Sequence, residues 1–336
     1  MRAWEIRGGF GLENLEVVER PKPVPGPGQV LLAMKAMSIN YRDLLMVRGH
    51  YNPRQPLPLV PLSDGVGVVE ELGDGVEHVS VGARVMPIFA QGWLDGEPSK
   101  SKITRTLGGP LDGTAAEYMV VDASSVVPAP EHLTDGEAAA LVCAGVTAWS
   151  ALVTQAIVKP GDVVLVQGTG GVSIFALQIA VMLGARVIVT SSSDEKLEQA
   201  RALGATHTIN YRAEKSWGKV ARKLAGGDGV DHVMEVGGAG TLEQSLKAVR
   251  PGGHVSMIGV LSGTTEPLNV IPILMQNIRI QGVLVGHKAS FEALAKAYAA
   301  HQLRPVISDT FGFDELPAAL EHMQRARHFG KIAVTL

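Results

Sequence analysis

The middle of the chain places a strand, a glycine turn and a helix in an order that few folds accommodate. An apolar run over Val163–Val166 leads into Gly168-Thr169-Gly170-Gly171-Val172-Ser173, a helical apolar pattern continues to Leu183, and a second apolar run covers Arg186–Thr190. The first glycine permits a tight turn, the second lets the backbone approach a phosphate, and the helix N-terminus offers unpaired N–H groups to an anion. We therefore predict that a dinucleotide pyrophosphate binds at Gly168, Thr169, Gly170, Gly171 and Val172.

One residue of this turn departs from the usual pattern. Ser173 stands where Gly or Ala is expected, and a hydroxyl at that position must find a hydrogen-bond partner close to the turn. Glycine-rich turns also occur wherever a chain bends sharply. The dinucleotide interpretation therefore depends on the strands and the helix around the turn as well as on its glycines.

Strands and helices alternate through the second half of the chain. After Lys159-Pro160-Gly161 we predict strands at residues 163–166, 187–190, 208–210, 232–236 and 254–260, with helices between them and an edge strand within 277–285. Thr134 and Glu137 form a capping box that opens an alanine-rich helix before this region. Such alternation builds a doubly wound parallel sheet with helices on both faces, so the fold class is α/β.

The first part of the chain has a different pattern. Short alternating runs between Met1 and Val121, such as Val30–Met34, are separated by the proline-rich segment Pro21–Gly28, which is typical of antiparallel β-structure with turns. We predict a mainly β, barrel-like domain over residues 1–126, completed by residues 288–336, and a dinucleotide-binding domain over residues 127–287.

Composition excludes several classes of protein. A formal net charge of −3 without basic clusters argues against nucleic-acid binding. Met1–Glu19 lacks the apolar core of a secretory signal, and no uninterrupted apolar run is long enough to span a bilayer, so we expect a cytoplasmic protein that binds no membrane. Cys143 is the one cysteine, which excludes an internal disulfide framework and a cysteine-rich structural zinc lobe.

These motifs together resemble one enzyme superfamily over nearly the whole chain. The residues that carry the resemblance are Ser38-Ile39-Asn40-Tyr41-Arg42-Asp43, Pro61-Leu62-Ser63-Asp64-Gly65-Val66-Gly67, Cys143-Ala144-Gly145-Val146-Thr147-Ala148-Trp149, the glycine turn and Ile209-Asn210-Tyr211-Arg212. The chain is similar to the zinc-independent branch of the medium-chain dehydrogenase/reductase superfamily, the quinone oxidoreductase-like enzymes. The resemblance implies a Rossmann cofactor domain and a GroES-like catalytic domain.

The resemblance also bears on zinc. Zinc-containing alcohol dehydrogenases of this superfamily carry a Cys ligand where Asn40 stands, a His ligand where Ser63 stands and a second Cys where Cys143 stands. Amide and hydroxyl groups are poor zinc ligands beside thiolate and imidazole. The segment Phe89–Thr106, where a structural zinc lobe often lies, contains no cysteine. We therefore expect no zinc, and we assign no histidine as a metal ligand.

The residues after the second strand of the dinucleotide unit indicate the cofactor. NAD enzymes of this fold commonly carry an acid there, whereas this chain has Thr190 followed by three serines. Ser192 and Lys196 are suited to bind a 2′-phosphate, and the resemblance places Tyr211 near it, so NADP(H) is favoured over NAD(H). The alternative is that Ser192 caps a helix in a box with Glu195, Lys196 is solvated and Tyr211 packs.

Three residues are candidates for stabilising the charge that develops on the substrate. The resemblance places Asn40, Asp43 and Tyr51 facing the nicotinamide, and a protonated Tyr51 phenol is suited to donate a proton or a hydrogen bond. Each has a structural alternative. Asn40 is also suited to close a turn, Asp43 to stabilise the first turn of a helix, and Tyr51 to pack in its proline-rich loop.

Four further residues are candidate cofactor contacts by the same resemblance. They are Thr147, Gly237, Gly259 and Lys331. Glycines in such places also simply end strands, and Lys331 is equally suited to be a solvated lysine at a strand start.

These observations predict an NADPH-dependent, zinc-independent oxidoreductase that reduces a quinone, an enone or a related activated double bond in a cleft between two domains. Its partner is a small electrophilic substrate. An NAD(P)-dependent alcohol or aldehyde dehydrogenase is the nearest alternative, and a non-catalytic nucleotide-binding regulator is a second one. Because Val270–Val285 is apolar and contains the predicted edge strand, we also expect a homodimer.

Overall fold

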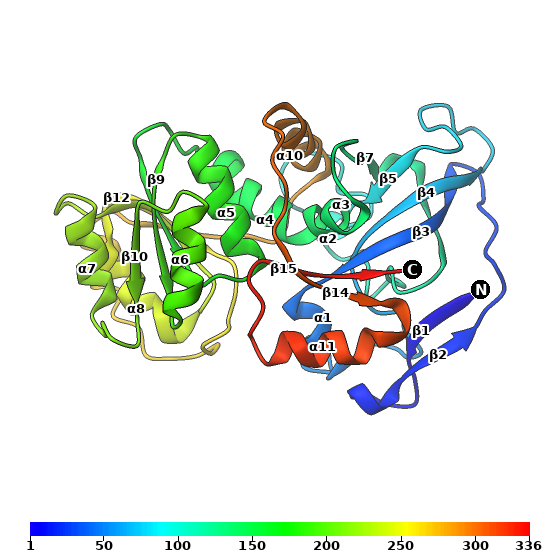
Figure 1. The fold of residues 1–336 in the computed structure, drawn as a ribbon, viewed down its shortest axis with the longest axis horizontal. Helices are drawn as coiled ribbons and strands as arrows, with labels where there is room; N and C mark the ends of the chain where they lie inside the picture. The colour runs from blue at the N-terminus through cyan, green and yellow to red at the C-terminus, as the bar shows by residue number, and fades with distance from the viewer. The chain divides into compact units, whose positions relative to one another are not determined.

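The computed structural model describes residues 1–336 and divides into two compact units. Unit 1 comprises Met1–Val146 and Gly286–Leu336, and unit 2 comprises Thr147–Val285. Figure 1 shows the strands and helices of each unit with the labels used below. Each unit has its own sheet, as the two sequence patterns predict.

Unit 1 is built on a seven-stranded sheet. Its order is β14-β15-β3-β4-β5-β7, with β6 paired to β3. Only β14 and β15 pair in parallel. The strands are β3 (Gln29–Ile39), β4 (Asp64–Leu72), β5 (Arg84–Pro87), β6 (Tyr118–Asp122), β7 (Val126–Pro128), β14 (Ile307–Gly312) and β15 (Lys331–Thr335). A separate hairpin joins β1 (Arg2–Ile6) to β2 (Leu15–Glu19).

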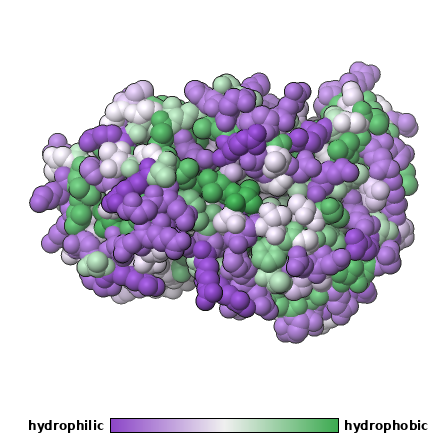
Figure 2. Space-filling view, viewed as in Figure 1, coloured by the Kyte–Doolittle hydropathy of each residue, from purple (hydrophilic) through white to green (hydrophobic).

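The helices of unit 1 lie in its connections. They are α1 (Tyr41–Val47), α2 (Lys100–Ile103), α3 (Asp135–Ala140), α10 (Lys288–Ala300) and α11 (Leu316–Gln324). Buried side chains of β3, α1 and α11, among them Met37, Leu44 and Leu320, form one apolar core. On the face drawn in Figure 2, hydrophilic residues predominate and apolar ones lie in scattered groups.

Unit 2 is a doubly wound parallel sheet with the order β10-β9-β8-β11-β12-β13. The strands are β8 (Val163–Gln167), β9 (Arg186–Ser191), β10 (His207–Asn210), β11 (Val230–Glu235), β12 (Val249–Met257) and β13 (Arg279–Gly282). All six predicted strands are present, and β10 and β13 lie at the two edges of the sheet. The strand order reverses between β8 and β11, and ligands of such sheets bind at the carboxyl ends of the strands at this switch point.

Helices cover both faces of this sheet, as Figure 1 shows. Helices α5 (Gly171–Met182) and α6 (Asp194–Ala202) cover one face, and α7 (Trp217–Leu224) and α8 (Ala239–Ala248) pack together on the other. The short helix α4 (Val146–Trp149) precedes the sheet, and α9 (Ile271–Met275) precedes β13.

The division between the units lies twenty residues later than the expected boundary at residue 126. Residues 127–146 belong to unit 1, where α3 packs against β3, β4 and β15. The reason is the small size of the α3 side chains, since Ala138, Ala139 and Ala140 are fully buried and let the helix approach the sheet closely. Thr134 and Glu137 cap this helix in the predicted box. The second division, at Gly286, is close to the expected residue 288.

One helical stretch qualifies the expectation that no segment is long enough to span a membrane. Asp135–Gln155 is helical over 21 residues, includes two π-helical turns, and has the length and hydropathy of a membrane span. However, 78% of its most apolar window is buried inside the protein. This burial is typical of a core helix, which passes the same test of length and composition.

Candidate active site

The glycine turn of unit 2 has the geometry of a phosphate cradle. Gly168 has a φ of +71°, which favours glycine. Its N–H donates to the carbonyl of Thr190 at 2.8 Å, which ties the turn to β9. Gly170 is the N-cap of α5, and a Cβ added there would meet no heavy atom within 4 Å. The turn is therefore open at Gly170, beside the N-terminal N–H groups of a twelve-residue helix.

The structure shows why a serine is tolerated at position 173, where the usual pattern has glycine or alanine. Its Oγ donates to the carbonyl of Gln167 at 2.7 Å, so the hydroxyl has the expected partner close to the turn. This bond joins the first turn of α5 to the end of β8. Serine therefore fits this position without leaving a buried polar group unpaired.

The end of β9 overturns the alternative role given to Ser192. The N-cap of α6 is Ser193, whose Oγ accepts from the N–H of Lys196 at 3.3 Å, and not Ser192. The reason is that β9 extends through Ser191 and the helix begins one residue later than the box with Glu195 requires. The hydroxyl of Ser192 is therefore not used as a helix cap.

No acid ends β9. Asp194, the first residue of α6, accepts from Asn210 Nδ2 at 2.7 Å. Lys196 is partly buried, which lowers the pKa of its ammonium group, while Glu195 opposes this shift. Tyr211 follows β10 and is exposed. The N–H of Tyr211 donates to the carbonyl of Ser191 at 3.1 Å, so the backbone of Tyr211 lies beside the end of β9, which carries no carboxylate.

Gly237 and Gly259 lie in two loops that are bonded to each other. The N–H of Ser262 donates to the carbonyl of Gly237 at 2.6 Å. A Cβ added at Gly259 would lie 2.5 Å from the carbonyl oxygen of Val236, so glycine is required for this close approach. Thr147, the first residue of unit 2, is buried in α4. Whether these three residues contact a cofactor stays a prediction.

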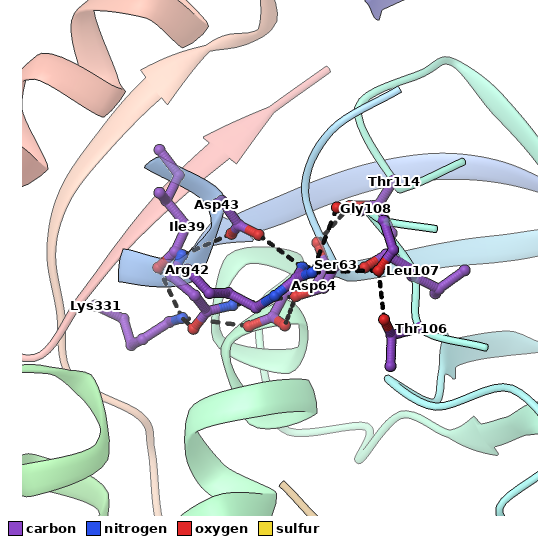
Figure 3. A network of polar contacts seen from close by, with 12 residues as sticks. Ile39, Arg42, Asp43, Ser63, Asp64, Thr106, Leu107, Gly108, Thr114 and Lys331 are labelled. Carbon is purple, nitrogen blue, oxygen red and sulfur yellow. Dashed lines mark hydrogen bonds and ion pairs between the residues drawn. The ribbon is translucent and has the colours of Figure 1, made fainter. Parts of the chain in front are cut away.

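A buried ring of hydrogen bonds in unit 1 joins Lys331, Asn40, Ser63 and Asp64, and Figure 3 labels Lys331, Ser63 and Asp64 among them. Lys331 Nζ donates to Asn40 Oδ1 at 2.6 Å and to Asp64 Oδ2 at 3.2 Å. Asn40 Nδ2 donates to Ser63 Oγ at 3.4 Å, and Ser63 Oγ donates to Asp64 Oδ1 at 3.1 Å, which closes the ring. The four residues come from the end of β3, the start of β4 and the start of β15. The ring therefore fixes the orientation of the Asn40 amide.

Lys331 is buried, whereas one of its two predicted roles was that of a solvated lysine. It is only 3% exposed, so the alternative of a solvated lysine is wrong. An ammonium group has three N–H donors, and here the third donates to the carbonyl of Ile39 at 2.9 Å. All three donors are thus used inside unit 1. This geometry argues against a direct cofactor contact and makes Lys331 a support for Asn40.

Asp43 is engaged in helix capping. Its Oδ2 accepts from the N–H of Asn40 at 2.8 Å, and Asn40 and Asp43 form the capping box of α1. Burial raises the pKa of this carboxyl to about 6, against the opposing effect of Arg42, while Asp64 also raises it. The structural alternative for Asp43 is therefore present in the fold, whereas its contact with substrate stays a prediction.

Tyr51 packs on Arg42, a residue that the sequence reasoning did not single out. The guanidinium of Arg42 lies 4.8 Å from the centre of the Tyr51 ring and 5.1 Å from that of Phe89. Arg42 also donates to the carbonyls of Leu107 at 3.0 Å and Gly108 at 3.4 Å. Tyr51 itself is 44% exposed. The cation–π contact holds its ring while the side chain stays accessible.

The residues at the positions of zinc ligands do not fit a catalytic zinc. Asn40 Oδ1 is occupied by the Lys331 ammonium, and Ser63 offers a hydroxyl that bonds Asp64. Burial raises the pKa of the Cys143 thiol, and the nearby Asp64 carboxylate raises it further. Zinc in proteins prefers thiolate and imidazole, and no group of three or more His, Cys, Asp or Glu side chains is placed to hold a metal ion. We derive no chemical step through zinc.

We expect Lys331→Met to destabilise the protein by roughly 3–5 kcal/mol, because it leaves the buried Asp64 carboxylate without a cation. Adding Asp64→Asn to this variant should recover part of the loss. The measurement is urea unfolding, with Lys35→Met at an exposed position of β3 as the control. If the Lys331→Met variant were as stable as the control, the ring would not contribute to stability as we expect.

Asp43 should make stability fall as pH rises. Its folded pKa of about 6 exceeds the ordinary value of 3.8, so its contribution is complete below 3.8 and is lost as pH rises through about 6. We expect Asp43→Asn to lose less stability than the wild type between about pH 5 and pH 7.5. Denaturant midpoints at both pH values test this, and equal losses would disprove it.

Two known protein families match parts of this chain. The family described as "Zinc-binding dehydrogenase" matches residues 171–300, and the one described as "Alcohol dehydrogenase GroES-like domain" matches residues 26–131. A zinc-type alcohol dehydrogenase-like protein of Schizosaccharomyces pombe is 44% identical, with 98% of this chain and 96% of that protein covered. A 2-haloacrylate reductase of a Burkholderia species is 32% identical, with 92% and 91% covered.

Solved structures agree with the fold. The crystal structure of a protein named as a putative alcohol dehydrogenase from Sinorhizobium meliloti has a TM-score of 0.93 and 42% identity, covering 100% of this chain and 98% of that one. These similarities span both units.

Proposed function

The chain belongs to the alcohol dehydrogenase-like oxidoreductases of the medium-chain dehydrogenase/reductase superfamily, and from this premise we propose that it reduces an activated double bond with NADPH and without zinc. The observation that carries the proposal is the Lys331-Asn40-Ser63-Asp64 ring. It occupies two of the positions at which zinc-containing relatives carry ligands. Stabilisation of negative charge on the substrate then falls to hydrogen-bond donors of the protein.

The proposed substrates are quinones, enones and related conjugated carbonyl compounds. Bound NADPH would supply a hydride to the electron-poor carbon of the double bond, the pair of that double bond would shift toward the carbonyl carbon, and the carbonyl pair would move to its oxygen to give an enolate. The enolate oxygen requires a proton or hydrogen-bond donors. A proton added at the neighbouring carbon would complete the reduction. The similarity to a 2-haloacrylate reductase supports this class, because its name describes reduction of a conjugated double bond.

Asn40 and Tyr51 are the proposed donors. Since Lys331 occupies Asn40 Oδ1, the amide presents its Nδ2 hydrogens, one of them to Ser63. Tyr51 carries its phenol on an accessible ring that Arg42 holds in place. Asp43 and Lys331 fix the backbone and the amide of Asn40, respectively.

An alcohol or aldehyde dehydrogenase is the second candidate function. It is favoured by the names of the Schizosaccharomyces pombe relative and the Sinorhizobium meliloti structure. An alcohol, however, needs its oxygen acidified before it can lose a hydride, and in zinc enzymes the metal does this. The ring at Lys331 provides no such Lewis acid, so reduction of double bonds is the function we favour.

NADPH is the proposed cofactor because no acid ends β9. The pyrophosphate would bind at Gly168–Val172, and Ser192, Lys196 and Tyr211 would receive the 2′-phosphate. A carboxylate at the strand end would repel that phosphate, whereas a lysine attracts it.

We expect Lys196→Ala to weaken NADPH binding about tenfold and to leave NADH binding unchanged, because NADH lacks the 2′-phosphate. Fluorescence titration with both cofactors measures this, and Lys219→Ala on the exposed side of α7 is the matched control. If the wild type bound NADH more tightly than NADPH, the cofactor proposal would be wrong.

Tyr51→Phe should lower turnover roughly a hundredfold, because it removes the proposed donor to the substrate oxygen. Tyr41→Phe is the control, since Tyr41 lies on the same segment with the same exposure of 44%. Steady-state oxidation of NADPH with an enone compares the two variants. Equal rates for both would remove Tyr51 from the mechanism.

We also propose a homodimer formed through the apolar surface beside β13. Leu274 and Met275 in α9 are 79% and 75% exposed, and β13 is an edge strand with an unpaired side. We further propose a cytoplasmic location, which suits a chain whose one cysteine, Cys143, forms no disulfide within it.

Replacing both Leu274 and Met275 by Lys should convert this dimer into a monomer of 35.4 kDa, because two charges would be buried against their copies. Light scattering after size exclusion measures the mass, with Val81→Lys at an exposed site of unit 1 as the control. A monomeric wild type would refute the dimer.

A further inference from the structure

A carboxylate without a charged partner is buried at the centre of unit 2. Glu235 ends β11 and is 0% exposed. Its Oε1 accepts from the N–H groups of Gly237 at 2.8 Å and Gly238 at 2.9 Å and from Thr241 Oγ1 at 2.5 Å. Its Oε2 accepts from Gln167 Nε2 at 2.7 Å and from Ser245 Oγ. Every one of these donors is neutral, although buried carboxylates are usually paired with a cation.

The direction of these bonds shows that the carboxyl acts only as an acceptor. Ser245 Oγ accepts from Gln167 Nε2 at 2.7 Å, so its own proton is available for Glu235. The amide groups of Gly237 and Gly238 have only protons to offer. A protonated Glu235 would bring a hydrogen into a site filled with hydrogens. The network is therefore arranged for the ionised form, as an anion in a cradle of N–H and O–H groups.

Glu235 lies where the strand order of the unit 2 sheet reverses, which is where ligands of such sheets bind. Gln167 ends β8 and Glu235 ends β11, and these two strands are neighbours where the strand order reverses. Each of these two strands leads into a helix, β8 into α5 after the glycine turn and β11 into α8 after Gly238. Both starts therefore offer positive backbone groups to an anion.

The two helix starts differ in what fills them. At α5, Gly170 faces open space. Before α8, a φ of +85° at Gly238 turns successive N–H groups inward. Those of Gly237 and Gly238 reach Glu235, and that of Ala239 donates to the carbonyl of Gly263 at 3.0 Å. The start of α8 already holds an anion that belongs to the chain.

We propose that Glu235 is the internal anion that fills the amide cradle in front of α8, so that the cofactor pyrophosphate is directed to the start of α5. Glu235 is a positioning residue, because it acts through the backbone of residues 236–238. Gln167 Oε1 accepts from the N–H groups of Val236 and Gly237, both at 3.3 Å, and joins this loop to the residue before Gly168. The part of the inference that concerns the pyrophosphate rests on the proposed function, whereas the internal anion does not.

The test is chemical rescue of Glu235→Ala by formate, a carboxylate small enough to enter the space left by the side chain. We expect this variant to melt about 10 °C below the wild type, because buried N–H groups lose their acceptor. Formate should raise its melting temperature, and chloride at the same ionic strength should not. Glu243→Ala on the exposed face of α8 is the matched control and should not respond to formate. NADPH affinity should fall about tenfold in Glu235→Ala and recover with formate.

A second variant serves if Glu235→Ala does not fold. Glu235→Gln places an amide NH₂ among donors and should be destabilised, whereas Gln167→Glu combined with Glu235→Gln exchanges the two groups and should regain stability. If formate raised the melting temperature of Glu235→Ala but the wild type did not bind NADPH, the proposed cofactor would be wrong. The inference that Glu235 is an internal anion would still be supported. Melting that formate raises no more than chloride does, or an exchanged pair no more stable than Glu235→Gln, would overturn the inference.

Discussion

The hydrogen bonds and the ion pair of the buried Lys331 ammonium group are the interactions on which the proposed catalytic site in unit 1 depends. A charge with 3% exposure is tolerated only with close partners, and Asp64, Asn40 and the Ile39 carbonyl supply them. Satisfying this one group holds the ends of β3, β4 and β15 together and orients the Asn40 amide. Lys331 also occupies Asn40 Oδ1, at one of the positions where zinc-containing enzymes of the superfamily carry a ligand. The proposal of chemistry without zinc starts from this contact.

The fold was largely predictable because its signals are local. The strand, glycine turn and helix at residues 163–183, and the alternation after them, define a parallel sheet whose six strands the structure contains. Local signals were weaker where packing decides. The cap of α6 is Ser193 and not Ser192, because β9 extends one residue further than its sequence pattern indicates. Residues 127–146 belong to unit 1 and not to unit 2, because α3 packs on the sheet of unit 1.

The candidate site was predictable only in part, because its contacts join distant parts of the chain. Asn40 and Ser63 were recognisable in the sequence as residues that replace zinc ligands. Lys331, however, is 291 residues from Asn40 in sequence, and no local sequence pattern predicts the hydrogen bond between them. Glu235 was overlooked for a related reason, since an acid at the end of an apolar strand resembles the start of a loop. One signal was available. An acid placed two residues before a pair of glycines, just where a parallel strand ends, suits a carboxylate that accepts from the amides that follow it.

The central claim is that hydride transfer to an activated double bond proceeds here without zinc. The most direct measurement incubates metal-analysed protein with NADPH deuterated at the transferred position and a panel of quinones, enones and aldehydes, and follows deuterium into the products by mass spectrometry. A parallel incubation with NADP⁺ and a panel of alcohols measures alcohol oxidation. The account predicts deuterium on the carbon of a conjugated double bond, at full rate in protein that holds far less than one zinc per chain. One zinc per chain together with oxidation of alcohols, or no transfer to any acceptor, would contradict it.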